Sequence, residues 1–523
     1  MGVPDSRATV DTGGQCSHHE TGEIVNELQQ MSATSLVGAI RRRDVSAREA
    51  VESQLDRIAA VNPVINAVVT LAPDDARAAA EAADRLTVSG ADLPPLHGLP
   101  MTHKDTHDVA GMRSTHGSPL FADHVPDDDA PIIARLRAAG VISMGKSNVP
   151  EFAAGSHTFN PVFGTTTNPY DPTCSAGGSS GGLAAALAAG IQPLGDGSDM
   201  GGSLRIPASF CHVVGFRPSH GVIPMPAVDN DWAWLSRTGP MARTVEDIAL
   251  FMAATAGPSE RVLPSAPLTG ASFAGIFEGS GGAGGGRDPG DLRGVRIGWS
   301  PDFGLGVPVQ AEVLEVLRSQ MRHFEEAGAI VEEASIDFTG ADLVFERTRA
   351  TDFAAGLGPL VEGHRDQIKP EVSWNVDAGW SLTATELIEA TAARTRLAAG
   401  TRDFFSRYDL FLSPAAQVLP FDATLRYPAA INGTASTSYL DWMRSASLLS
   451  ATGVPVLALP AGLSSPGLPV GFQLATNHYR DVELLRYARA FEARAGCGGQ
   501  RPDLVPGTGQ AQGPIITVGP EQG

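Results

Sequence analysis

The chain contains 523 residues, and 42% of them are hydrophobic, which is enough to bury an extensive core. Its 38 Lys and Arg residues are outnumbered by 58 Asp and Glu residues, so the formal net charge is −20. Nucleic acids and anionic membrane surfaces both select basic protein faces, and this charge argues against either as a partner.

The positions of the cysteines and the lengths of the apolar segments indicate in which cellular compartment the protein is expected. The longest apolar stretch, residues 183–194, is interrupted by Gly190 and Gln192, and the first residues lack the apolar core of a secretory signal. The cysteines are widely separated and form no C-x-x-C pair: Cys16, Cys174, Cys211 and Cys497. We therefore expect a soluble, cytoplasmic protein with no disulfide framework, no zinc site and no membrane segment.

Helical patterns dominate the N-terminal part of the chain, after a tail over residues 1–20 that we expect to be disordered. The pattern is helical from residue 23 to about residue 86, with a capping box at Ser46 and Glu49 and a second helix after Pro73. The next expected elements are a strand within residues 96–104, a helix over 131–139 and a strand over 141–144. Such alternation predicts a sheet covered by helices.

Similar elements follow a Gly-rich insertion over residues 270–290, which includes the flexible run 279–286. The expected strands are 295–299, 329–331, 410–412 and 454–459, and the expected helices are 309–327 and 481–494. Residues 501–523 are interpreted as a C-terminal tail.

Residues 165–218 differ from the rest of the chain. Two Gly/Ser clusters, 177–182 and 197–203, lie on either side of an Ala-rich helix. Small residues allow backbone amides and hydroxyl groups to crowd together, so this segment is typical of an active-site floor rather than a linker.

Two motif matches in the chain are weak in context. Residues 140–147 fit the phosphate-loop pattern G-x-x-x-x-G-K-S, but their middle is strand-like and Pro150 prevents a following helix, so we do not expect nucleotide binding. Five histidines lie within 28 residues, where glycines and Pro100 indicate strand and loop rather than the paired-His helix that zinc prefers. They are His97, His103, His107, His116 and His124. No metal is expected.

The run Gly177–Gly181 satisfies G-x-S-x-G, the nucleophile elbow of α/β-hydrolases. An elbow follows a strand directly, whereas this run follows a segment with two prolines and no β pattern. An esterase of that fold, with Ser179 as its nucleophile and a histidine as its base, therefore remains an alternative hypothesis.

The combination of motifs is more specific than any one of them. The sequence Gly-Gly-Ser179-Ser180-Gly-Gly is followed 24 residues later by Ser203 in Gly-Gly-Ser203-Leu-Arg, and Lys104 lies upstream in Pro-Met-Thr-His-Lys104-Asp. These motifs and their flanks, over about residues 23–495, resemble the amidase signature family, whose members share a Ser-cisSer-Lys triad. The resemblance implies one large α/β domain over residues 21–500, with a mixed, twisted β-sheet core covered on both faces by α-helices.

The resemblance also implies roles for individual residues. Ser203 corresponds to the nucleophile, Ser179 to the bridging serine after a cis Gly178–Ser179 peptide, and Lys104 to the general base. The implied oxyanion hole consists of the backbone amides of Met200, Gly201, Gly202 and Ser203. Ser180, Asp199 and Arg205 are expected to support these groups without taking part in the chemistry.

The chemistry is consistent with these roles. A serine hydroxyl needs an adjacent base, and a lysine serves as one only when burial lowers its pKa enough to leave it neutral. Ser179, both donor and acceptor, would relay the proton between Lys104 and Ser203. The variable stretch 340–450 is expected to form the pocket rim, with Trp374, Trp380 and Trp442 as candidate apolar walls, although core packing is the favoured role of each.

We expect an amidohydrolase that cleaves carboxylic amide C–N bonds without a cofactor. Carbamate (urethane) and ester bonds are alternative targets of the same chemistry. Its partner would be a small-molecule substrate, and the protein would be a monomer or homodimer. A further alternative is an amidotransferase component that works within a complex on charged tRNA. The net charge of −20 argues against that role, and the sequence shows no polar clamp for a charged amino acid.

Overall fold

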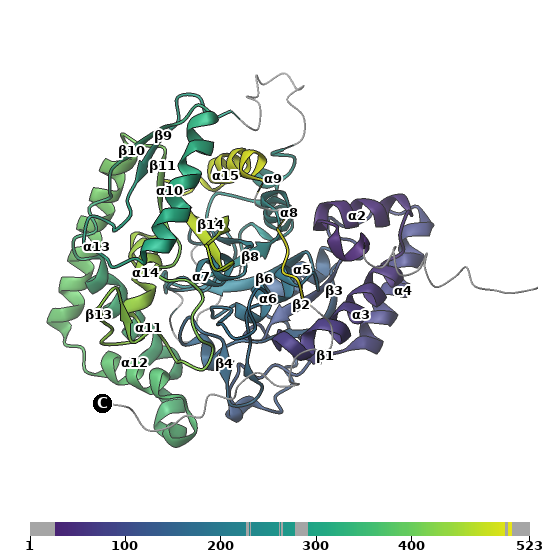
Figure 1. Ribbon diagram of the computed structural model, residues 1–523. Helices are drawn as coiled ribbons and strands as arrows, with labels where there is room; N and C mark the ends of the chain where they lie inside the picture. Colours follow the sequence, from purple (N-terminus) through teal and green to yellow (C-terminus); the bar gives the residue numbers. More distant parts are fainter. Residues whose placement is uncertain are drawn as a thin grey trace, which may run out of the picture.

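A mixed sheet of eight strands runs through the centre of the computed structural model, which describes residues 27–225, 230, 232–260, 262, 265–277, 291–496 and 500–504 (Figure 1). The strand order is β10-β9-β11-β15-β14-β7-β8-β6, in which β9 pairs in parallel with β10 and β11 and the other neighbours are antiparallel. The strands are β6 (Leu194–Asp199), β7 (Val214–Arg217), β8 (Arg237–Ala242), β9 (Arg296–Trp299), β10 (Ile330–Glu333), β11 (Leu410–Pro414), β14 (Val456–Leu463) and β15 (Pro469–Ala475).

A second sheet of three strands, in the order β1-β3-β2, lies against β6 of the large sheet through its strand β2. Strand β2 pairs in parallel with β3, and β1 pairs with β3 in the antiparallel direction. The remaining strands are β1 (Val68–Leu71), β2 (Pro100–Lys104), β3 (Ile142–Ser147), β4 (Phe159–Asn160), β5 (Gly164–Thr165), β12 (Ala430–Ile431) and β13 (Thr434–Ala435).

Helices surround both sheets, with α2, α3 and α4 at one side of the molecule and α11, α12 and α13 at the opposite side (Figure 1). The α-helices are α2 (Ala33–Arg42), α3 (Ala47–Ile65), α4 (Pro73–Ser89), α5 (Pro131–Ala138), α6 (Gly181–Ala188), α7 (Arg205–Phe210), α8 (Val245–Thr255), α9 (Gly270–Phe273), α10 (Ala311–Glu326), α11 (Ala341–His364), α12 (Pro370–Trp380), α13 (Ala384–Phe405), α14 (Arg444–Thr452) and α15 (Asp481–Ala495). Short 3₁₀ helices are η1 (Pro119–Phe121), η2 (Glu151–Ala153), η3 (Arg365–Gln367) and η4 (Asp441–Met443).

Strand β14 shows why helices cover both faces of the sheet. Successive side chains of a strand point to opposite faces, and every residue from Val456 to Leu459 is buried. Leu457 and Leu459 belong to the hydrophobic cluster that includes side chains of α10 and α15, whereas Val456 and Ala458 belong to clusters that include side chains of α7. The predicted fold class, a mixed sheet covered on both faces, is confirmed.

Local signals placed several elements correctly. The capping box that begins α3 is present, because Ser46 N donates to Glu49 Oε2 at 2.8 Å and Glu49 N donates to Ser46 Oγ at 3.1 Å. Helix α4 begins at Pro73, whereas the sequence predicted a start directly after this proline. The prediction of a helical pattern from residue 23 to about residue 86 was wrong at β1, because pairing with β3, which lies far along the chain, holds these residues as a strand.

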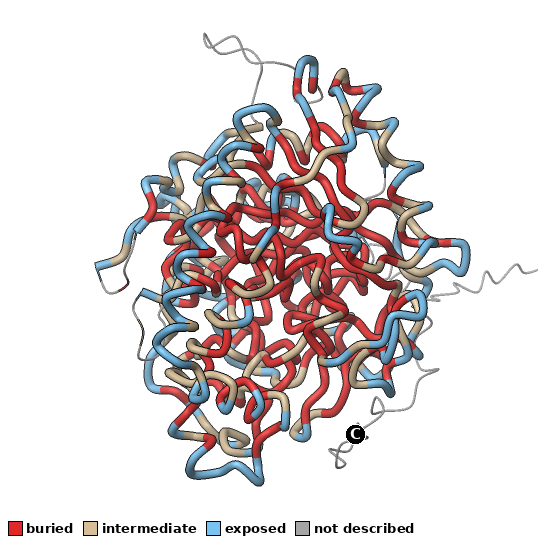
Figure 2. Tube along the Cα trace, turned by 90° about the vertical axis from the view of Figure 1, so that its left-hand side faces the viewer, coloured by how far each residue is buried: buried red, intermediate tan, exposed pale blue. Residues whose placement is uncertain are grey.

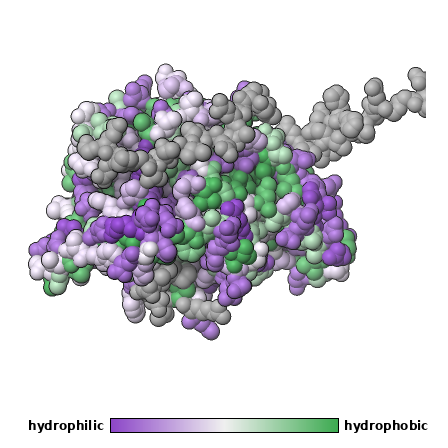
Figure 3. Space-filling view, turned by 90° about the horizontal axis from the view of Figure 1, so that it is seen from below, coloured by the Kyte–Doolittle hydropathy of each residue, from purple (hydrophilic) through white to green (hydrophobic). Residues whose placement is uncertain are grey.

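Burial is concentrated in the centre of the molecule, and exposed residues lie at its periphery (Figure 2). On the face seen from below, a hydrophobic area is bordered by hydrophilic residues (Figure 3). In the described part of the chain no helix is both long and apolar enough to cross a membrane. The predicted tail 1–20, the glycine run 279–286 and most of the predicted tail 501–523 lie outside the described residues, whereas the start of the expected insertion forms helix α9.

Candidate active site

Three separate segments bring the predicted catalytic residues to one place. Lys104 is the last residue of β2, and Ser179 and Ser180 come directly before α6. Strand β6 ends at Asp199, and Ser203 lies in the loop between β6 and α7. The two Gly/Ser clusters therefore meet beside the end of β2, with the Ala-rich helix α6 connecting them as predicted.

The Lys104 side chain is completely buried among serine oxygens. Its Nζ atom lies 2.8 Å from Ser179 Oγ, 3.0 Å from Ser180 Oγ and 2.9 Å from Ser198 Oγ, and the carbonyl oxygen of Ser198 is 3.4 Å away. The amine thus has four oxygen atoms within hydrogen-bond distance, but no carboxylate among the described residues lies within ion-pair distance of it.

This environment favours the neutral amine. Burial lowers the pKa of Lys104 from 10.5 to about 7, because the charged form loses its hydration, while the carboxylates of Asp199 and Asp196 oppose the change. A lysine with this pKa is substantially unprotonated near neutral pH and can accept a proton from a neighbouring hydroxyl group.

Ser179 and Ser203 both line a cavity of about 240 Å³. Ser179 is 1% exposed and Ser203 is 7% exposed, so the Ser203 hydroxyl group is the more accessible of the two. The backbones of the two segments are joined where Ser180 N donates to the Ser203 carbonyl oxygen at 3.2 Å. The Gly178–Ser179 peptide bond is cis.

The loop before Ser203 lines the same cavity with Ser198, Asp199, Met200 and Gly201. Gly202 has φ +117°, and a Cβ atom there would lie 2.6 Å from Ala446 Cβ, so a glycine is required. The amide of Gly202 donates to Asp199 Oδ1 at 2.8 Å, whereas those of Met200, Gly201 and Ser203 have no hydrogen-bond partner among the described residues. Of the four amides that the resemblance assigns to an oxyanion hole, the Gly202 amide is therefore already engaged by Asp199.

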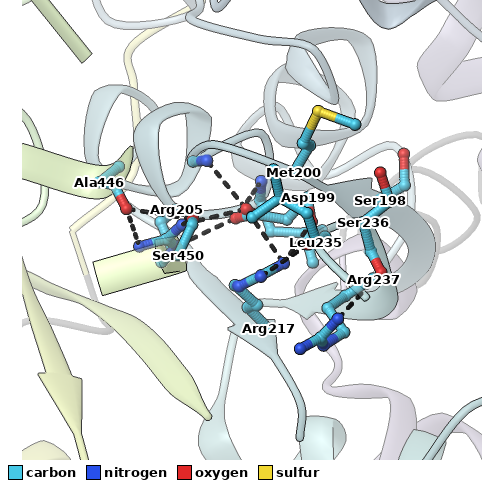
Figure 4. Close-up of polar contacts among 12 residues, drawn as sticks. Ser198, Asp199, Met200, Arg205, Arg217, Leu235, Ser236, Arg237, Ala446 and Ser450 are labelled. Atoms are coloured by element: carbon cyan, nitrogen blue, oxygen red, sulfur yellow. Dashed lines mark hydrogen bonds and ion pairs between the residues drawn. The ribbon is translucent and has the colours of Figure 1, made fainter. Parts of the chain in front are cut away.

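Asp199 and Arg205 form a buried pair that shapes this loop (Figure 4). Arg205 donates from Nε to Asp199 Oδ2 and from Nη2 to Asp199 Oδ1, each at 3.0 Å, and Arg217 Nη1 lies 3.7 Å from Oδ1. Burial alone would raise the pKa of the Asp199 carboxyl group, but the two guanidinium charges outweigh it and hold the pKa well below its usual range. Leu204 N also donates to this carboxylate, at 3.1 Å.

A family model described as Amidase matches residues 49–485 of the chain. The chain belongs to the amidase signature family. The region matched contains every residue of the site described above.

Individual members of the amidase signature family resemble the chain over almost its whole length. An acylamidase of Rhodococcus erythropolis is 34% identical over 472 residues, which cover 89% of this chain and 96% of the relative. One component of the glutamyl-tRNA(Gln) amidotransferase of Heliobacterium modesticaldum is 31% identical over 505 residues, covering 91% and 99%. The crystal structure of a bacterial aryl acylamidase gives a TM-score of 0.82 at 28% identity and covers 91% of this chain and 100% of that one.

The sequence motifs did not reveal the role of Asp196, whose carboxylate contacts two histidines and the backbone of Lys104. Asp196 Oδ1 lies 2.6 Å from His103 Nδ1, its Oδ2 lies 2.7 Å from His107 Nδ1, and the Lys104 amide donates to Oδ2 at 3.3 Å. The spacing of His103 and His107 does not indicate that they share a carboxylate, because Asp196 lies 89 residues after His107 in the chain.

The remaining histidines and Lys146 have separate surroundings. His97 Nε2 lies 2.8 Å from Thr87 Oγ1, and His116 Nε2 lies 3.2 Å from Asp108 Oδ1. Within the described ranges, no three His, Cys, Asp or Glu side chains are arranged to hold a metal ion. Residues 140–147 form a turn and β3 rather than a loop that opens a helix, and Lys146 is buried, with its Nζ donating to Ser114 Oγ at 2.9 Å.

The three tryptophans that the sequence suggested as cavity walls do not line the cavity. Trp442 is buried in a hydrophobic cluster, and Trp374 and Trp380 are about half exposed, so none of the three lines the cavity. The stretch 340–450 does contribute to it. The wall residues from that stretch are Arg349, Phe353, Leu357 and Met443. The sequence did not indicate that Arg349, a cation, would line this cavity.

Proposed function

We propose that the chain hydrolyses carboxylic amides through an acyl-enzyme on Ser203. The observation that carries the proposal is the 2.8 Å contact between Lys104 Nζ and Ser179 Oγ, in a site whose lysine is completely buried. A neutral lysine and a bridging hydroxyl group supply the base that a serine nucleophile needs.

The proposed reaction begins when the Ser203 oxygen attacks the amide carbonyl carbon. Its proton passes to Ser179, and Ser179 passes its own proton to neutral Lys104. The available amides of Met200, Gly201 and Ser203 stabilise the oxyanion. When the C–N bond breaks, the same relay returns the proton to the departing amine, and water then hydrolyses the ester on Ser203 with the relay again acting as base.

The cavity supports a small substrate with an apolar part. Its volume is about 240 Å³, and Phe152, Phe353, Leu357 and Met443 contribute apolar wall. Anilides of short carboxylic acids meet these requirements, and the acylamidases among the relatives act on amides, as their names state. Carbamates and esters carry the same electrophilic carbonyl group and are proposed as alternative substrates.

Labelling with a sulfonyl fluoride and peptide mapping tests the nucleophile. The expected adduct is on Ser203, and S203A should show neither the adduct nor hydrolysis of 4-nitroacetanilide. An adduct on Ser179 would contradict the proposal and favour the nucleophile-elbow hypothesis. That hypothesis already lacks its base, because no histidine of the described chain is hydrogen-bonded to Ser179, whose Oγ contacts Lys104.

A second candidate, a component of an amidotransferase, is favoured by the similarity to the Heliobacterium modesticaldum protein. The two functions differ in what the isolated chain can do. Hydrolysis of 4-nitroacetanilide by the purified chain alone supports the acylamidase proposal. Activity confined to glutamine, and only after addition of partner proteins and tRNA, would support the second candidate.

A further inference from the structure

Arg349 is a buried cation in the wall of the candidate active site. It lies on α11, is 3% exposed and lines the same cavity as Ser179 and Ser203. Its guanidinium carbon lies 4.3 Å from the centre of the Phe353 ring and 5.7 Å from that of Tyr439. Both distances are within the range over which a cation interacts favourably with an aromatic ring.

All the polar partners of Arg349 are neutral. Its Nε donates to Asn375 Oδ1 at 3.1 Å, its Nη2 donates to Tyr439 Oη at 2.6 Å, and its Nη1 contacts Met200 Sδ at 3.0 Å. Among the described residues, no Asp or Glu oxygen lies within 4.0 Å of the guanidinium group. Arg205, which is equally buried, is by contrast bonded twice to Asp199.

The hydrogen-bonding capacity of Arg349 is incompletely used. A guanidinium group has five N–H donors in a rigid plane, and a thioether sulfur is only a weak acceptor. The Nη1 group of Arg349 therefore contacts the sulfur of Met200, a cavity residue, and has no strong acceptor among the described residues. Asp352, one helical turn away on α11, interacts with Arg349 electrostatically but forms no ion pair with it. A buried charge without a carboxylate in direct contact is costly, and a bound carboxylate would reduce that cost through paired, charge-assisted hydrogen bonds.

Met200 connects Arg349 to the loop in which the proposed reaction takes place. It lies three residues before Ser203, its side chain contacts Arg349, and its backbone amide belongs to the proposed oxyanion hole. A group held by Arg349 would therefore lie in the same cavity as the bond to be cleaved.

We propose that Arg349 is a specificity-determining residue that binds a carboxylate of the substrate. The preferred substrates are then amides that carry a free carboxylate on the acyl or the amine part, such as monoamides of dicarboxylic acids or N-acylated aminocarboxylic acids. This inference rests on the proposed amide hydrolysis, and its first test does not require turnover.

Calorimetry on S203A tests the carboxylate site directly with two matched pairs of probes. The acyl-side pair is succinanilic acid and butyranilide, and the amine-side pair is N-acetyl-4-aminobenzoate and 4-methylacetanilide. The carboxylate of at least one pair is expected to bind at least about tenfold more tightly than its neutral partner, an advantage of roughly 1.4 kcal/mol. Neutral probes that bind as tightly as both carboxylates would overturn the proposal.

The same titrations on Arg349→Met and Arg349→Lys, each in S203A, assign the site. Methionine keeps apolar volume without charge and should abolish the carboxylate advantage. Lysine keeps the charge but not the planar pair of donors and should retain only part of it. An advantage that persists in Arg349→Met would overturn the assignment. Arg365→Met in S203A, which removes an exposed cation paired with Asp377, is the matched control and should bind as S203A does.

Steady-state kinetics with Ser203 intact separate recognition from a structural role. Arg349→Met should lower kcat/KM for the carboxylate anilide at least about tenfold more than kcat/KM for its neutral partner, and the difference should lie mainly in KM. Equal losses on both substrates would show that Arg349 merely supports the loop. An enzyme that binds carboxylates through Arg349 but hydrolyses no amide would contradict the proposed function and leave the binding site established.

Discussion

At the Nζ atom of Lys104, four oxygen atoms lie within hydrogen-bond distance of a group that has at most three protons. A neutral amine has two protons and one lone pair, so it can accept from one serine while it donates to the others. Three of these oxygens are hydroxyl groups, which rotate to suit either protonation state. The site can therefore take up and release a proton without moving a heavy atom.

Replacing Lys104 should remove the base and little else. Lys104→Met keeps an unbranched side chain of similar length, and we expect kcat for 4-nitroacetanilide to fall by about 10²–10⁴-fold, the usual contribution of a general base. Melting temperature and circular dichroism serve as controls for folding. Wild-type activity in a folded Lys104→Met protein would refute the proposed mechanism.

The rate should depend on pH through the same group. Only neutral Lys104 acts as a base, and burial lowers its pKa to about 7. We therefore expect kcat/KM to fall about tenfold per pH unit below pH 7 and to reach a plateau above it, because deprotonation activates the enzyme. A stopped-time assay between pH 5 and pH 10 measures this profile. A rate that still rises between pH 9 and pH 10 would indicate an unperturbed lysine.

At the scale of elements, the loop between β6 and α7 depends on one buried ion pair. Asp199 is the last residue of β6, and Arg205 is the first residue of α7. The Asp199 carboxylate also accepts hydrogen bonds from the backbone amides of Gly202 and Leu204. Arg205 extends the connection to α14 and β15, since it donates to Ser450 Oγ at 2.6 Å and to Gln473 Oε1 at 2.9 Å, residues found far along the chain.

Removal of this guanidinium group should destabilise the protein strongly. Arg205→Met leaves a buried carboxylate with only part of its compensation, and we expect the free energy of unfolding to fall by about 3–5 kcal/mol. Urea denaturation followed by tryptophan fluorescence measures the change. Arg365→Met, at the exposed pair with Asp377, is the comparison and should leave stability almost unchanged. Equal stability of the two variants would contradict this account of the loop.

The elements also show what the sequence could and could not predict. Local signals such as the Ser46 capping box and Pro73 were sufficient, because the interactions that define them lie within one helical turn. Strand β1 was missed because its pairing with β3 is nonlocal. The roles of Asp196 and Arg349 could not be predicted for the same reason, since no local pattern reports which distant groups a side chain will meet.

At the scale of the whole molecule, the candidate site lies where the two sheets meet. Lys104 comes from the three-stranded sheet, and Ser198 and Asp199 come from the edge strand of the eight-stranded sheet. Gln192 joins the sheets. Its Oε1 accepts from Thr102 N at 2.9 Å and from Thr102 Oγ1 at 2.7 Å, and its Nε2 donates to Leu194 O at 3.0 Å. The relative position of lysine and serines thus depends on contact between the sheets.

Gln192→Leu tests this connection. The variant leaves buried backbone groups of Thr102 and Leu194 without partners, and we expect stability to fall by about 1–3 kcal/mol. Because β2 can then shift against β6, kcat should fall more than KM rises. Urea denaturation and steady-state kinetics measure the two effects. Full activity at reduced stability would show that the sheets hold the lysine in place without this side chain.

The Asp199 carboxylate acts on two properties of the proposed catalyst that are usually considered separately. It holds the Gly202 amide and so shapes the loop that receives the oxyanion, and its charge opposes the lowering of the Lys104 pKa without any contact between the two side chains. A substitution that reshapes the loop by removing this charge must also move the working pH of the enzyme towards acid. One carboxylate thus couples the shape of this loop to the pH at which the proposed base becomes neutral.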